Sequence, residues 1–134
     1  MGKKKEIKFN SLIPELSVSN IENSKKFYQE IGFEIIYERP EDKFCFIQLE
    51  GNQIMIEEIN SNWNAGELKY PYGNGINISM SIKDVEELYN LLKNKEIKFF
   101  IDLKISEYKV NNKVFRDKEF LIQDPDGYLL RFND

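Results

Sequence analysis

Histidine is absent from this chain, and cysteine and tryptophan each occur only once. Without imidazole, the commonest metal-ligating side chain is missing. The single cysteine, Cys45, cannot form an internal disulfide, and no histidine is present to activate it as a nucleophile. Because Cys45 lies in the apolar run FCFIQL, we expect a buried thiol in the core rather than a reactive one.

Long apolar runs and an excess of positive charge are missing as well. No stretch reaches the length needed to span a membrane, and no signal-peptide core is present. The net charge of −4 and the pI of about 5.1 argue against a broad nucleic-acid-binding surface. We therefore expect a soluble, cytoplasmic protein that binds neither nucleic acid nor membranes.

What the sequence does contain is an internal repeat. Residues 16–36 read LSVSNIENSKKFYQEIGFEII, and residues 80–100 read MSIKDVEELYNLLKNKEIKFF. A repeat of this length indicates two copies of one supersecondary unit that share a core. Aligned without a gap, the matched pairs include Leu16 with Met80, Val18 with Ile82, Asn20 with Asp84 and Ile21 with Val85.

Each copy predicts one strand, one helix and then three strands. In the first half, alternation and helical spacing predict a helix over 21–31 and strands at 12–18, 33–39, 43–49 and 53–59. In the second half, the same signals predict a helix over 84–95 and strands near 76–82, 97–103, 117–123 and 127–133. The segments 60–74 and 105–116 carry no apolar period and are predicted to be irregular.

Local signals mark the ends of these elements. Asn20 is placed as the N-cap of the first helix, and Gly32 is placed to end it in a left-handed cap. Asp84 with Glu87 forms a capping-box-like start for the second helix. The segment 124–127, Asp-Pro-Asp-Gly, predicts the turn between the last two strands. The buried stripe of the second helix is predicted to be Val85, Leu88, Leu91 and Leu92.

Two motifs accompany the repeat. The first is IPELSVSN at 13–20, followed by SKKFY at 24–28 and IGF at 31–33; the second is DPDGYLLRF at 124–132. Together they resemble the vicinal oxygen chelate superfamily, which includes glyoxalase I, extradiol dioxygenases, fosfomycin-resistance enzymes and bleomycin-resistance proteins. The resemblance implies an α+β fold in which two tandem βαβββ modules, at 11–60 and 75–134, form curved mixed sheets around a cleft. It also implies that 1–134 is a single domain and that the protein is a homodimer.

The resemblance further places the four metal-ligand positions of the superfamily's metalloenzymes at Ile13, Glu57, Asn77 and Arg131. Only Glu57 is an ordinary ligand, because isoleucine has no donor atom, arginine has no lone pair to give and asparagine is a weak oxygen donor. A transition metal needs several good donors that converge on it. We therefore expect no metal and no cofactor, and enzymatic activity is not favoured. The bleomycin-resistance branch of the superfamily likewise works without a metal, and the sequence LRF at 130–132 is similar to that branch.

Strand alternation and aromatic content select the candidate site. If Leu16 and Val18 pack against the helices, the residues of opposite parity face the cleft. Aromatic rings on the irregular segments add flat surfaces, and Phe115 falls where the resemblance places a stacking tryptophan. The alternative is a closed sheet whose polar residues bond to one another. The predicted ligand-binding residues are Glu15, Glu57, Trp63, Asn77, Tyr108, Phe115 and Arg131.

These residues predict a metal-free protein that sequesters a planar, cationic small molecule, such as a bleomycin-type antibiotic. The carboxylates of Glu15 and Glu57 suit a cationic ligand. Two alternatives remain open: a lyase or oxidoreductase of the glyoxalase or dioxygenase kind with an atypical metal site, and a stress or regulatory protein that binds a metabolite. Without a metal, Glu57 and Arg131 are predicted to form an ion pair at the vacated centre.

Overall fold

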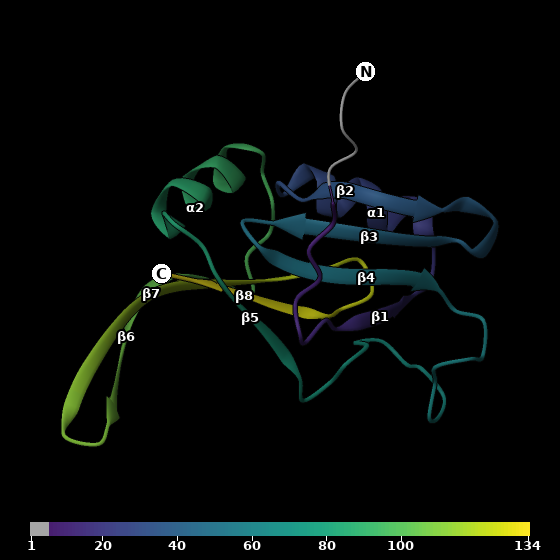
Figure 1. Ribbon diagram of the computed structural model, residues 1–134. Helices are drawn as coiled ribbons and strands as arrows, with labels where there is room; N and C mark the ends of the chain where they lie inside the picture. Colours follow the sequence, from purple (N-terminus) through teal and green to yellow (C-terminus); the bar gives the residue numbers. More distant parts are fainter. Residues whose placement is uncertain (1–5) are drawn as a thin grey trace. The chain divides into compact units, whose positions relative to one another are not determined.

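A computed structural model describes residues 6–134, which form an α+β fold of two four-stranded sheets, each with one helix (Figure 1). The chain divides into two compact units, the first ending at Glu67 and the second running from Leu68 to Asp134. The predicted fold class, two βαβββ modules with mixed sheets, is confirmed. Within the described residues, neither helix has the length and apolarity needed to cross a membrane.

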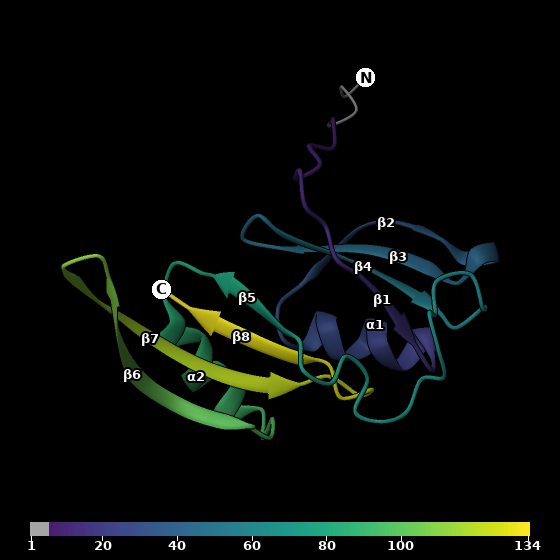
Figure 2. The ribbon, with the colours of Figure 1, turned by 90° about the horizontal axis from the view of Figure 1, so that it is seen from below.

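The first unit carries its strands in the order β1-β4-β3-β2. Strand β1 runs parallel to β4, and the other neighbours are antiparallel. Helix α1 packs on one face of this sheet, as Figure 2 shows. The elements are β1 (Glu15–Val18), α1 (Ile21–Glu30), β2 (Glu34–Arg39), the 3-10 turn η1 (Pro40–Asp42), β3 (Phe44–Leu49) and β4 (Asn52–Glu58).

The second unit repeats this topology, with the strand order β5-β8-β7-β6 and a parallel pair of β5 with β8. Helix α2 packs against β7. The identical order of the two sheets shows that the sequence repeat is a structural repeat. The elements are β5 (Asn77–Ser81), α2 (Val85–Asn94), β6 (Ile101–Val110), β7 (Lys113–Gln123) and β8 (Leu129–Asn133).

Both helices begin where the capping residues predict. The side chain of Asn20 accepts a hydrogen bond from the backbone N–H of Asn23 at 3.0 Å, and that of Asp84 accepts one from Glu87 at 3.0 Å. These bonds satisfy N–H groups that have no partner inside the helix. Gly32, with φ of +114°, follows α1 in the left-handed region that favours glycine.

Alternation along β1 and β4 separates the side chains buried on the side of α1 from those on the opposite face. In the first sheet Leu16, Val18 and Ile56 are buried on the side of α1, so Glu15 and Glu57 face away from the helix. The second sheet buries the corresponding strand residues against α2. These are Met80, Phe120, Ile122, Leu130 and Phe132.

One core residue of α2 was predicted wrongly. The helix buries Val85 and Leu92, whereas Leu91 is 49% exposed. Residues at i and i+7 lie on the same side of a helix, and Leu91 lies about 100° away from Leu92 around the axis. Tyr89 completes the inner face by packing its ring against Phe99 and Phe120, with centroids 4.6 and 5.7 Å apart.

The predicted irregular stretch at 105–116 is wrong, because β6 and β7 continue through it as a hairpin. Cross-strand partners include Tyr108 with Phe115 and Val110 with Lys113, and Asn111 adopts a φ of +58° in the turn. Figure 1 shows this hairpin extending beyond the rest of its sheet. Both faces of the extension are exposed, so the segment lacks the apolar alternation that marks a half-buried strand.

Strand β1 is also shorter than predicted, beginning at Glu15 rather than at residue 12. The carbonyl of Pro14 still accepts a hydrogen bond from the N–H of Met55 at 3.0 Å. Proline has no N–H to continue the ladder, which ends the regular strand at this point.

The predicted turn at 124–127 is present, and the backbone of residues 70–72 packs against it. The side chain of Asp124, which is buried, accepts hydrogen bonds from the N–H groups of Asp126 and Tyr128, both at 2.9 Å. Gly127 has a φ of +94°, and a Cβ placed on it would lie 2.7 Å from the Cα of Pro71. The backbone of 70–72 therefore lies directly on the turn and requires glycine there.

We predict that Gly127→Ala lowers the free energy of unfolding by on the order of 3 kcal/mol, because backbone strain and a backbone clash add together. The matched control is Gly51→Ala, at a φ of +81° with no atom within 4 Å of the added Cβ. The control should cost only about 1 kcal/mol. Chemical denaturation of both variants measures the difference, and equal costs would contradict the packing of Pro71 on the turn.

Candidate ligand-binding site

The face of the first sheet that points away from α1 carries two carboxyl groups on neighbouring strands. Strand β1 pairs with β4 so that Glu15 lies opposite Met55 and Ser17 lies opposite Glu57. Glu15 and Glu57 are therefore diagonal neighbours on one face of the sheet. Their carboxyl groups are hydrogen-bonded to each other.

Both oxygens of Glu57 also accept hydrogen bonds from the segment that follows β4. The Nδ2 of Asn60 donates to Oε1 at 2.7 Å, and the Nε1 of Trp63 donates to Oε2 at 3.1 Å. The indole ring is 66% exposed although its N–H is held. The carboxylate of Glu57 thus fixes the position of an otherwise open aromatic ring.

The carboxyl pair shifts the acidity of Glu15. Burial of the carboxyl group raises the pKa of Glu15 to about 7, and the hydrogen bond to Glu57 and the negative charge of Glu57 act in the same direction. The guanidinium of Arg39 opposes the shift. Near neutral pH the carboxyl group of Glu15 is therefore about half protonated.

Two rows of side chains cross this face of the sheet. One row is Glu15, Met55, Phe46 and Tyr37, and the other is Ser17, Glu57, Phe44 and Arg39. The ring of Tyr37 is stacked on that of Phe46 with centroids 5.2 Å apart, and the guanidinium of Arg39 lies 3.8 Å above the ring of Phe44. Tyr37, Phe46, Arg39 and Phe44 were not among the predicted residues, because only the strand register brings them into line with the carboxyl pair.

An acidic pocket of about 360 Å³ adjoins Glu57. Its four carboxylates exceed the single ammonium of Lys43, which lies 3.7 Å from Glu58. Such an excess of negative charge attracts cations. The lining residues are Glu41, Asp42, Lys43, Glu57, Glu58, Ile59, Asn60 and Asn62.

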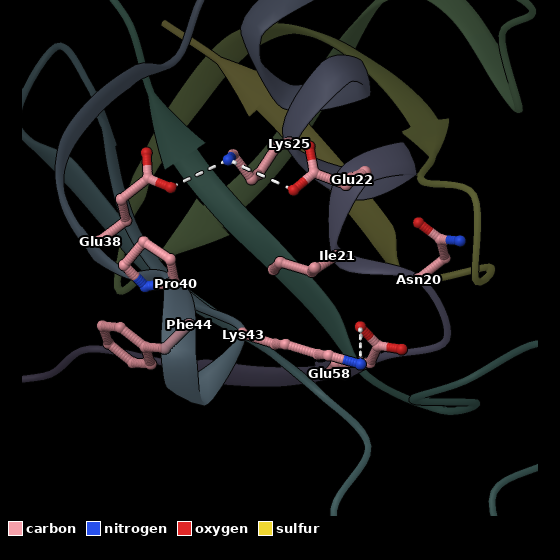
Figure 3. Close-up of a pocket in the computed structure, with 9 residues that line it drawn as sticks. All are labelled: Asn20, Ile21, Glu22, Lys25, Glu38, Pro40, Lys43, Phe44 and Glu58. Atoms are coloured by element: carbon pink, nitrogen blue, oxygen red, sulfur yellow. Dashed lines mark hydrogen bonds and ion pairs between the residues drawn. The ribbon is translucent and has the colours of Figure 1, made fainter.

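A second pocket of about 350 Å³ lies at the N-terminal end of α1 (Figure 3). Its charged groups are already paired: Lys25 lies 2.9 Å from Glu38 and 3.6 Å from Glu22. Ile21 and Phe44 add apolar surface. None of the predicted ligand-binding residues lines this pocket, and its internal ion pairs leave little charge for a ligand.

In the second unit, Tyr108 and Phe115 form a stacked pair with centroids 5.9 Å apart and planes 16° apart. They lie on β6 and β7 and not on a loop as predicted, although both rings remain nearly half exposed. The hydroxyl of Tyr108 donates to Asp117 at 3.1 Å. The hydrogen bond to this carboxylate raises the pKa of Tyr108.

Arg131 lies on β8 between Ser79 of β5 and Leu121 of β7. Its Nη1 is 3.7 Å from Oε2 of Glu119, and its Nε is buried with no hydrogen-bond partner. Asn77 lies opposite Leu129 at the start of β5 and is exposed.

The structure thus brings together part of the predicted set in each unit. Glu15, Glu57 and Trp63 form one cluster, and Tyr108 and Phe115 form another. Glu57 has hydrogen-bond donors in its own unit, and Arg131 has a carboxylate partner in its own. The ion pair predicted between Glu57 and Arg131 stays a prediction.

The residues at the superfamily's metal-ligand positions do not fit a metal ion. Ile13 offers no donor atom and Arg131 no lone pair, while both oxygens of Glu57 already accept hydrogen bonds. Among residues 6–134, no three histidine, cysteine, aspartate or glutamate side chains gather closely enough to hold a metal ion. We derive no metal-dependent chemistry from these positions.

The carboxyl pair predicts a specific pH dependence of stability. The folded-state pKa of Glu15 is raised above its ordinary value of 4.5, so its contribution to stability is fully present below about pH 4.5 and is lost as the pH rises to about 7. Glu15→Gln removes this loss. We expect the variant to match the wild type near pH 4.5 and to exceed its free energy of unfolding by about 1 kcal/mol at about pH 8.5, since the residue's exposure weakens the effect.

Urea denaturation across this pH range measures the difference. Glu34→Gln, at an exposed position on β2, is the matched control and should leave the pH profile unchanged. A gap between wild type and Glu15→Gln that does not widen with pH would contradict the raised pKa of Glu15.

Comparisons with known proteins agree with the fold. The family model described as Glyoxalase/Bleomycin resistance protein/Dioxygenase superfamily matches residues 9–132. Among curated proteins, none matches the chain.

Several solved structures are similar to this chain over most of its length. A superfamily member from Vibrio splendidus 12B01 is 32% identical over 89% of this chain and 93% of its own, with a TM-score of 0.41. A glyoxalase/bleomycin resistance protein/dioxygenase from Alicyclobacillus acidocaldarius is 20% identical over 92% and 89%, with a TM-score of 0.66. TioX from Micromonospora sp. ML1 is 13% identical over 93% and 98%, with a TM-score of 0.71.

Proposed function

Because the chain belongs to the glyoxalase/bleomycin resistance protein/dioxygenase superfamily, we propose that it binds and sequesters a planar, cationic small molecule of the bleomycin type without a metal. The observation that carries this proposal is the hydrogen-bonded carboxyl pair of Glu15 and Glu57, with the exposed ring of Trp63 fixed on Glu57. A ligand with a flat ring and a positive charge matches both parts of this cluster.

Charge favours a cation over a neutral ligand. The acidic pocket beside Glu57 carries more carboxylates than ammonium groups. Its one lysine, Lys43, is paired with Glu58, and Asp42 is paired with Arg39.

Aromatic surface favours a planar ligand. Stacking on an aromatic ring adds roughly 0.5–1.5 kcal/mol beyond area burial. The hydrogen bond from Trp63 to Glu57 orients the indole before a ligand arrives, which lowers the entropy lost on binding. Tyr108 and Phe115 supply a second flat surface in the second unit, and the unpaired Nε of Arg131 supplies a donor for a ligand oxygen.

The proposal includes the protein's surroundings. We propose that it acts in the cytoplasm as a homodimer and engages neither nucleic acid nor membranes. Asn77, an exposed amide at the start of β5, completes the proposed polar contacts.

The direct test is a fluorescence titration of Trp63, the only tryptophan of the chain. Metal-free bleomycin should quench or shift its emission in a saturable way, with one site per chain. Flat aromatic compounds that are neutral or anionic should bind at least about tenfold more weakly, because they lack the charge that the carboxylates attract. An emission spectrum unchanged by any of these compounds would refute the proposal.

Variants then locate the site. Trp63→Ala and Phe115→Ala should each weaken binding of bleomycin by roughly 1–3 kcal/mol if the rings are anchors, as measured by titration calorimetry. Phe100→Ala removes another exposed ring, 55% accessible, and is the matched control that should bind normally. Unchanged affinity in both site variants would mean that the ligand binds elsewhere.

A further inference from the structure

A pocket of about 440 Å³ lies in the second unit, beside the turn at 124–127. Three aromatic rings and one ammonium group contribute to its wall, and none of the predicted ligand-binding residues does. Aromatic surface with a few polar groups is typical of small-molecule sites. The lining residues are Tyr70, Lys98, Phe99, Phe100, Gln123, Asp124 and Pro125.

Two of the rings extend from a part of the chain that the fold holds in place. The ring of Phe99 packs on those of Tyr89 and Phe120, with centroids 4.6 and 5.6 Å apart. The backbone N–H of Phe100 donates to the carbonyl of Leu121 on β7 at 2.8 Å, while its ring is exposed. A flat ligand that stacks on these rings meets surfaces already in position, which limits the entropy lost on binding.

The third ring, that of Tyr70, lies against the turn. A Cβ placed on Gly127 would be 3.0 Å from Cε2 of Tyr70. Within residues 6–134, no group forms a hydrogen bond with the hydroxyl of Tyr70 or an ion pair with Lys98. The pocket therefore offers a hydroxyl donor and an ammonium donor to a ligand.

The one carboxylate of the pocket is used by the turn itself. Asp124 is 3% exposed, and its Oδ1 accepts hydrogen bonds from the N–H groups of Asp126 and Tyr128. Of the two charged side chains that line the pocket, only Lys98 is exposed. A ligand with a negative charge is attracted by this ammonium group, whereas a cation is repelled.

We propose that this pocket binds a small aromatic carboxylate, with its ring on Phe99 and Phe100 and its carboxylate on Lys98 and the hydroxyl of Tyr70. An inorganic anion would gain little from one exposed ammonium group in water, so the ring supplies a necessary part of the affinity. This second site lies in the second unit and takes a ligand opposite in charge to that proposed for the Glu57 cluster.

The probe for the test is 2-naphthoate, a flat aromatic carboxylate, and the matched neutral compound is 2-naphthamide. Binding is followed by ¹⁵N–¹H NMR, because the pocket contains no tryptophan. We expect saturable shifts of the amides at 98–100 and 123. We also expect affinity for 2-naphthoate to be about tenfold higher than for 2-naphthamide, since a charge-assisted hydrogen bond is stronger than a neutral one.

Variants separate the charge from the rings. Lys98→Met keeps an apolar side chain and removes the ammonium group, so it should weaken 2-naphthoate about tenfold and bind both compounds equally. Lys109→Met makes the same change of net charge at an exposed position on β6 and should behave as the wild type. Phe100→Ala should weaken both compounds about fivefold, because both stack on the ring.

A preference for the carboxylate that survives in Lys98→Met would overturn the site. So would the absence of saturable binding at millimolar 2-naphthoate, or amide shifts confined to the first unit. If Phe100→Ala does not fold, Lys98→Met decides, because it changes an exposed side chain. Lys98→Met should bind bleomycin as the wild type does, so this proposal and the proposed function fail separately.

Discussion

The parallel pairing of β1 with β4 constrains this molecule more than any other contact. It places Glu15 and Glu57 on one face of the sheet, where two negative charges cannot lie side by side without a proton or a cation between them. The same carboxylate of Glu57 holds Asn60 and Trp63, so the segment after β4 takes its position from that residue. Acidity, local backbone position and the exposed indole are thus consequences of one strand register.

The two units use one scaffold for different chemistry. The parallel strand pairs of the two sheets can be matched residue by residue. Glu15 opposite Met55 in the first sheet then corresponds to Ser79 opposite Arg131 in the second. In each sheet the side that faces the helix is part of the core, and the opposite side differs between the two sheets. The first sheet carries carboxyl groups there, and the second carries a guanidinium with the exposed rings of the hairpin.

Most of the fold could be predicted because its signals are local. The caps Asn20 and Asp84 and the turn at 124–127 act through bonds to residues two to four positions away, so the sequence displays them directly. The hairpin at 105–116 was missed because both of its faces are exposed, so its sequence shows no apolar alternation. The exposure of Leu91 was missed because the apolar residues of α2 do not encode the angle at which the helix packs on the sheet. The site was only partly predictable: Glu15, Glu57 and Trp63 were selected singly, but their mutual hydrogen bonds depend on a diagonal register between strands some 40 residues apart.

The central claim is that burial and the neighbouring Glu57 raise the pKa of Glu15 to about 7, and the carboxyl resonance of Glu15 reports on this pKa directly. A ¹³C NMR titration of the free protein, with Glu15 assigned by comparison with Glu15→Gln, follows that single group. The account predicts a midpoint near pH 7, with a smaller inflection at the same pH in the indole N–H of Trp63. A midpoint for Glu15 at its ordinary value of about 4.5 would contradict it.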